Sequence, residues 1–157
     1  MGRIRNIRRL RDSKGANLVE AAIITPLLLL LTFGIVDFSA MFYCYLALEH
    51  GVSQATRYAV TGQQMSPSGT PIGREASIKE AMRQATPTLT LPDSAFSFQF
   101  MPVNGSSWSN GLGGPDDVGR VTVNYTWSFM TPLIRPFFSG GRVNLRVQST
   151  MKNESVF

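Results

Sequence analysis

The sequence predicts an α+β protein: a long, partly transmembrane N-terminal helix, then a small domain with a short helix and an antiparallel sheet of about three strands. Apolar residues recur at helical spacing from about residue 17 to about residue 60. A shorter helical pattern covers residues 74–86, and three later segments alternate apolar and polar residues. At 157 residues, the chain has room for one small domain after the long helix.

The net positive charge of the chain comes from its first 15 residues. Six bases and one acid precede Ala16, which gives +5, and nine bases face nine acids from Ala16 onward. The formal net charge of +5 therefore belongs entirely to this basic segment. Because the rest of the chain is neutral, we expect no nucleic-acid-binding face and no nucleic-acid partner.

The segment from Leu18 to Val36 predicts a membrane span. It holds 36 − 18 + 1 = 19 residues and a single charge, Glu20. At about 1.5 Å per residue, this length crosses a hydrocarbon core of about 30 Å. The basic segment before it predicts a cytoplasmic N-terminus and an extracytoplasmic C-terminal domain. A cleavable signal peptide fits less well, because the candidate site at 38–40 has a bulky Phe38 at position −3.

One helix is expected to continue past the span. Apolar residues recur at spacings of three and four beyond Asp37, and Gly62 is a suitable stop. Pro26 removes one backbone donor within the span, which predicts either a harmless kink or a site where the helix bends during assembly. The expected division is residues 1–15 as a basic leader, 16–61 as the long helix with its span over about 18–36, and 62–157 as the extracytoplasmic domain.

The domain at 62–157 is expected to pair its last two long strands. The predicted strands are 96–100, 121–129 and 143–150, each with alternating apolar side chains, and the short amphipathic helix ends before Pro87. The connection over residues 130–141 would join the last two strands antiparallel, with the helix covering their apolar faces.

Three loop features have alternative interpretations. Trp108, in the Gly- and Ser-rich segment 104–119, either folds onto the domain or contacts another protein. Asp116 and Asp117 favour turn chemistry over a calcium site, because further spaced oxygen ligands are lacking. The apolar segment 131–138, with Phe137 and Phe138, is either a lid on the core or a docking ridge for a partner.

The residue pattern does not indicate an enzyme. Cys44 and His50 lie six positions apart on one predicted helix, so their side chains do not face each other. The sequence shows no glycine-rich phosphate loop, nucleophile elbow or His/Cys metal cluster. We expect no catalytic residues, no cofactor and no bound metal, and a lone Cys44 that serves packing.

The residues GANLVE at 15–20 resemble a type IV prepilin leader junction. In such leaders a membrane peptidase cuts after the glycine on the cytoplasmic side and leaves a glutamate at the fifth mature position. The resemblance implies processing between Gly15 and Ala16 and an assembly role for Glu20. Glycine suits the site physically, because it leaves an extended backbone unobstructed in a protease cleft.

The chain further resembles the TadE-like family of pilus assembly proteins, the minor pseudopilins of the tight-adherence (Tad, type IVc) pilus. The resemblance is in GANLVEAAIITPLLLLLTFGIVDFS, VTVNYTWSFMTPLIRPFFSGG and STMKNE. It implies a pilin-like domain and a location in the bacterial inner membrane or, after processing, in the extracellular pilus. The partners it implies are a prepilin peptidase, the major pilin of the Tad (Flp) pilus, other TadE- and TadF-like pseudopilins, and inner-membrane platform proteins.

A head larger than that of a major pilin favours a low-abundance subunit at the pilus tip or in initiation. Two other functions remain open. One is an inner-membrane scaffold that is never cleaved, and the other is a tip adhesin that binds through Trp108 or neighbouring loops.

Overall fold

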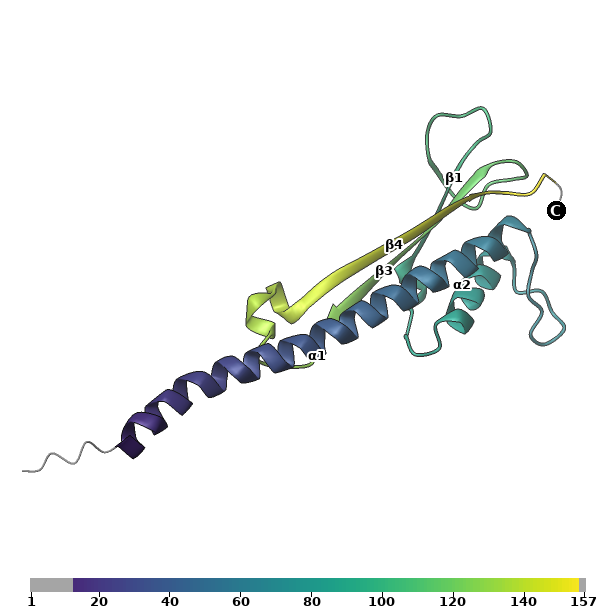
Figure 1. The fold of residues 1–157 in the computed structure, drawn as a ribbon. Helices are drawn as coiled ribbons and strands as arrows, with labels where there is room; N and C mark the ends of the chain where they lie inside the picture. Colours follow the sequence, from purple (N-terminus) through teal and green to yellow (C-terminus); the bar gives the residue numbers. More distant parts are fainter. Residues whose placement is uncertain (1–12, 156–157) are drawn as a thin grey trace, which may run out of the picture.

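The computed structural model describes residues 13–155, in which one long helix projects from a small α+β head (Figure 1). Residues 1–12 of the predicted leader lie outside the described part. The elements in chain order are α1 (Ser13–Val60), α2 (Arg74–Ala85), β1 (Phe96–Met101), β2 (Ser109–Asn110), β3 (Val118–Ser128) and β4 (Arg142–Lys152). The predicted α+β class is therefore confirmed.

The four strands form one antiparallel sheet in the order β2-β1-β3-β4. The three predicted strands are β1, β3 and β4, whereas β2 was not expected. With only two residues, β2 is too short to show an alternating pattern in the sequence. The central strand β3 starts at Val118, three residues before the predicted start, and Phe129 lies just beyond its end.

The core lies between one face of the sheet and the second half of α1. On the strands, Val123 faces Val147 and Tyr125 faces Leu145 across the β3–β4 ladder. Helix α1 contacts both of these strands. The short helix was expected to provide this cover, which was wrong, because the face is occupied by apolar side chains from the second half of the long helix. Its buried side chains recur at spacings of three and four: Cys44, Leu48, Val52, Ala55 and Ala59.

Helix α2 lies beside α1 and covers β1. Ile78 and Met82 of α2 are fully buried in the same core cluster as the α1 and strand residues. The Lys79 ammonium lies 6.0 Å from the ring centre of Phe98, at the outer limit for a cation–π contact. The sheet therefore has one apolar face, covered by two helices. The other face is exposed and polar, through Asn124, Thr126, Asn144, Arg146 and Gln148.

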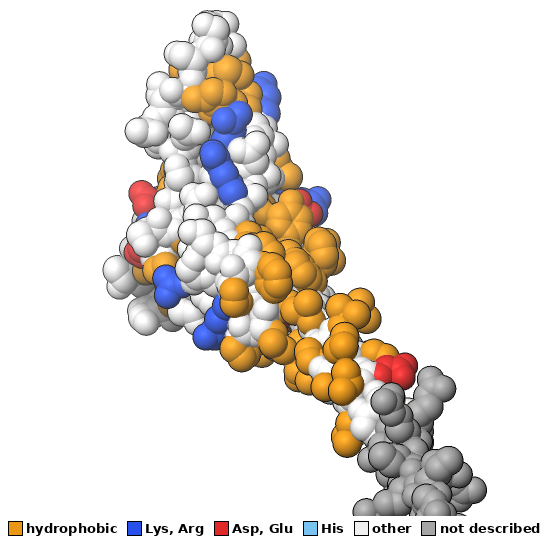
Figure 2. Space-filling view, turned by 90° about the vertical axis from the view of Figure 1, so that its left-hand side faces the viewer, with side chains coloured by type: hydrophobic (Ala, Val, Ile, Leu, Met, Phe, Trp, Pro, Cys, Tyr) orange, Lys and Arg blue, Asp and Glu red, His pale blue; other side chains and the backbone are white. Residues whose placement is uncertain are grey.

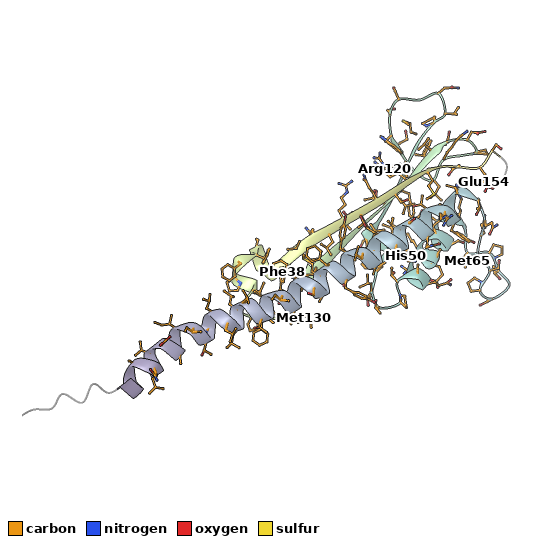
Figure 3. The ribbon with its side chains drawn as sticks, in the orientation of Figure 1. Phe38, His50, Met65, Arg120, Met130 and Glu154 are labelled. Atoms are coloured by element: carbon orange, nitrogen blue, oxygen red, sulfur yellow. The ribbon has the colours of Figure 1, made fainter. Side chains whose placement is uncertain are left out.

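Three hydrogen bonds, two from backbone groups and one from a side chain, fasten the C-terminal end of α1. Gly62 adopts a φ of 65°, and its N–H donates to the carbonyl of Ala59, as expected for a glycine at a helix stop. The Arg74 guanidinium also donates to Ala59, and the N–H of Glu154 donates to Val60. In Figure 3, Glu154 accordingly lies close to the end of α1.

Leu48 and Leu46 offer a matched test of the core, because they lie on opposite sides of the same helix. Leu48 is fully buried and Leu46 is 62% exposed. We expect Leu48→Ala to lower the free energy of unfolding by about 2–5 kcal/mol through cavity formation. Leu46→Ala should change it by about 0.5 kcal/mol or less. Denaturant unfolding of the full chain in detergent measures both, and equal effects would contradict this placement of the core.

Candidate functional site: the projecting helix and its junction with the head

The predicted processing residues lie in the exposed first turns of α1. Gly15, Ala16 and Glu20 are all exposed, and nothing lies within 4 Å of the position of a Cβ at Gly15. The structure describes α1 from Ser13 onward, so Gly15 and Ala16 lie among the first described residues of this helix.

The helix runs past Pro26 as one element, from Ser13 to Val60. Proline leaves the carbonyl of Ala22 without its usual backbone donor. A bend at Pro26 during assembly stays a prediction.

The first part of α1 projects away from the head. From Gly15 to Phe33 every side chain is exposed except that of Leu30, which is half-buried. In the most apolar 18-residue window of this helix, 6% of the window is buried inside the structure. This part of the helix therefore does not form the core of the head. Its length and composition suit a single-pass membrane anchor.

The β3–β4 connection (residues 129–141) packs against α1 where the exposed stretch of the helix ends. The Cδ1 atom of Ile134 lies 3.6 Å from the position of a Cβ at Gly34, and Ile134 is 6% exposed. One turn further along, the fully buried carboxylate of Asp37 accepts hydrogen bonds from the backbone N–H groups of Met130 and Thr131, each at 3.0 Å. The hydroxyl of Thr131 donates to the same carboxylate.

An aromatic cluster extends this junction. The rings of Phe129 and Phe138 stack with centroids 4.3 Å apart, and Phe38 of α1 meets Phe129 edge-on at 5.7 Å. Figure 3 shows Phe38 and Met130 where the connection meets the helix. Phe137, in contrast, is 70% exposed. The connection therefore acts as a lid, because Ile134 and Phe138 turn inward. Other apolar side chains of the connection are exposed.

The geometry of the connection depends on Gly141. Its φ is 66°, and a Cβ there would lie 2.9 Å from the Cγ of Arg135. Its carbonyl accepts from the N–H of Phe129, while the Nε of Arg135 donates to the carbonyl of Phe129. These bonds close the connection into a compact loop.

Trp108 is folded onto the sheet, which is one of the two arrangements considered. It is half-buried, and the Arg120 guanidinium of β3 lies 3.6 Å from its ring centre. Figure 3 shows Arg120 near the end of the sheet that is remote from Phe38. A partner contact through Trp108 would therefore use only the part of the ring that Arg120 leaves exposed.

Asp116 and Asp117 have protein partners consistent with turn chemistry. Asp116 pairs with Lys152 at 2.7 Å and has a positive φ of 65°. The Asp117 carboxylate accepts from the N–H of Gly114 at 2.8 Å and from that of Val103 at 3.2 Å. In the part of the chain that the structure describes, there is no group of three or more His, Cys, Asp or Glu side chains arranged to hold a metal.

Cys44 and His50 are not a nucleophile–base pair. Cys44 is 1% exposed in the core, whereas His50 is exposed. Burial raises the pKa of the Cys44 thiol, which keeps the thiol protonated. This supports packing as the role of Cys44.

The sequence interpretation missed Asp37 as a functional residue. It was noted only as the residue where the span ends. A signal was present, because Asp37, Met41, Cys44 and Leu48 follow one another at helical spacing, which places an acid in the apolar stripe. Its partners were not evident, since Met130 and Thr131 lie more than 90 positions away.

The fold defines a class of protein. Its long helix has an exposed apolar first part that suits a membrane anchor, and the second part of the same helix packs into the core of a small α+β head. Within this class, residues 15–57 match the family model described as TadE-like protein, which confirms the resemblance over the long helix and implies a role in Tad pilus systems. Comparison with curated proteins and with solved structures found no match.

Asp37→Ala tests whether this carboxylate fastens the connection to α1. Leaving the N–H groups of Met130 and Thr131 without their acceptor should cost about 1–3 kcal/mol locally. We expect faster hydrogen exchange at these two amides, while the amides of β3 keep their protection. Glu49→Ala is the matched control, because Glu49 is exposed on the same helix. Unchanged exchange at residues 130 and 131 would contradict the role of Asp37.

Proposed function

We propose that this protein is a minor pseudopilin that takes part in assembly of a Tad (type IVc) pilus, at the tip or in initiation. The observation that carries the proposal is the family match, which begins at Gly15, the glycine of the predicted processing site. The exposure of Gly15, Ala16 and Glu20 supports it, because a peptidase and neighbouring subunits need access to these residues. The proposed orientation has a cytoplasmic N-terminus and an extracytoplasmic head.

Cleavage after Gly15 would create an ammonium group at Ala16, four residues before Glu20. That spacing places the two groups on the same face of α1, one turn apart. A carboxylate in hydrocarbon costs on the order of 2.5–3.5 kcal/mol at a helix centre and less near the interface. Pairing of Glu20 with the Ala16 ammonium of its own or a neighbouring subunit offsets this cost, which favours the packed helices of a growing fibre.

The size of the head supports the proposed position in the fibre. It includes a four-stranded sheet and α2 packed on one side of α1. A subunit of this bulk cannot repeat densely along a thin fibre, which favours a tip or initiating position. The proposed partners are the prepilin peptidase, the major pilin, other TadE- or TadF-like pseudopilins and the inner-membrane platform.

Processing is tested by intact mass and N-terminal peptide analysis of the protein from cells. We expect the wild-type chain to begin at Ala16 and a Gly15→Arg variant to begin at Met1, because a large side chain blocks the cleavage site. Gly2→Arg is the matched control, since it adds the same charge to the leader and should be processed normally. A wild-type chain that keeps residues 1–15 would favour the uncleaved membrane scaffold instead.

Assembly is tested separately with Glu20→Gln. The variant should be cleaved as wild type but should restore at least tenfold fewer fibres in cells that lack the native protein, because the amide cannot pair with an ammonium as an ion. Glu49→Gln, on the exposed side of the same helix, should restore normal fibre numbers. Electron microscopy counts the fibres. Normal fibre numbers with Glu20→Gln would contradict an assembly role for this carboxylate.

A further inference from the structure

The projecting part of α1 has the length of a bilayer core. From Gly15 to Phe33, where every side chain except that of Leu30 is exposed, there are 33 − 15 + 1 = 19 residues. At about 1.5 Å per residue they extend roughly 28 Å, close to the hydrocarbon thickness of about 30 Å. The contact of Ile134 with Gly34 follows directly. When the helix spans a bilayer, the β3–β4 connection therefore lies at the membrane surface.

The connection presents apolar side chains outward at this level. Met130 is 65% exposed, Phe137 is 70% exposed and Leu133 is 42% exposed, whereas the neighbouring Ile134 is buried and Phe138 is half-buried. The adjoining residues of α1, Ile35 and Val36, are also exposed. Figure 2 shows hydrophobic side chains continuing from the projecting helix onto the adjoining end of the head, whereas the far end is mostly polar in this view.

Basic groups lie on the head side of this apolar surface. Arg135 and Arg142 are both exposed, and with Ser128, Gly140 and Gly141 they line a shallow pocket that contains no acidic side chain. Apolar side chains directed into lipid with arginines directed toward phosphate groups are the arrangement of an interfacial membrane anchor. A contact site for protein would not need to coincide with the end of the span.

We propose that the β3–β4 connection is a second membrane-contacting element, which inserts Met130, Leu133 and Phe137 into the boundary between headgroups and acyl chains of the adjacent leaflet. The proposal rests on the single-pass anchor and is independent of the pilus role. Because Asp37 and the Phe38 cluster hold the connection against α1, the two membrane contacts belong to one unit and restrict tilting of the head on the bilayer.

Fluorescence quenching by brominated lipids tests the depth of the connection. The full chain is reconstituted in phosphatidylcholine–phosphatidylglycerol vesicles whose acyl chains carry bromine at positions 6 and 7. Phe137→Trp and Met130→Trp each add one indole at an exposed position, and wild type supplies the background from Trp108 and Trp127. Unchanged thermal unfolding in detergent confirms that each variant is folded.

Two control variants complete the design. Val103→Trp places the indole at a similarly exposed position, 60%, beyond the opposite end of β1 and β3. Leu28→Trp, at a residue 58% exposed in the middle of the projecting helix, reports the span itself in vesicles brominated at positions 11 and 12.

The expected result is quenching of the added indole by at least twofold for Phe137→Trp and Met130→Trp, with none for Val103→Trp. If Leu28→Trp is quenched while the two connection variants behave like Val103→Trp, the connection stands clear of the lipid and the proposal is overturned in favour of a protein neighbour. If Leu28→Trp is not quenched either, the span is absent and the proposal fails with it.

Discussion

The head depends on packing between the second half of α1 and one face of the sheet. Leu48, Val52 and Ala55 are at most 2% exposed, and they meet strand residues such as Val123, which is fully buried. Without α1 the sheet would expose its apolar face to water, and so small a domain has no other core of comparable size. The exposed apolar segment that suits a membrane anchor and the segment that builds the core are therefore one helix, Ser13–Val60.

Helix α1 therefore passes from an exposed apolar part to a part that is buried in the head. The junction at Gly34 and Asp37 lies at this transition. Ile134 lies at van der Waals distance from the position of a Cβ at Gly34, and Asp37 provides acceptors for backbone donors at the turn after β3. A buried carboxylate is tolerated only when hydrogen bonds replace water, and the three donors from Met130 and Thr131 do so. The connection is thereby fastened to α1 next to the exposed part of the helix.

The sequence predicted those parts of the fold that depend on local periodicity. The pattern at residues 74–86 corresponds to α2, and the alternation around Val121 and Val147 corresponds to β3 and β4. It also identified Gly15, Ala16 and Glu20, whose roles are still proposals, through their order behind a basic segment. Folding of Trp108 onto the domain was one of two arrangements considered. Its stacking on Arg120 was not predicted, because contact between residues 12 positions apart depends on how the loop returns to the sheet.

By itself, the sequence determined the α+β class, the long helix with its apolar first half, and the family resemblance that residues 15–57 confirm. These properties follow from composition and from spacings of two, three or four residues, which are local. Only the tertiary structure decided that Asp37 binds the turn after β3, that Phe138 turns inward while Phe137 turns outward, and that the β3–β4 connection meets α1 at Gly34. Those outcomes depend on contacts between residues about 90 to 100 positions apart, for which no local pattern carries information.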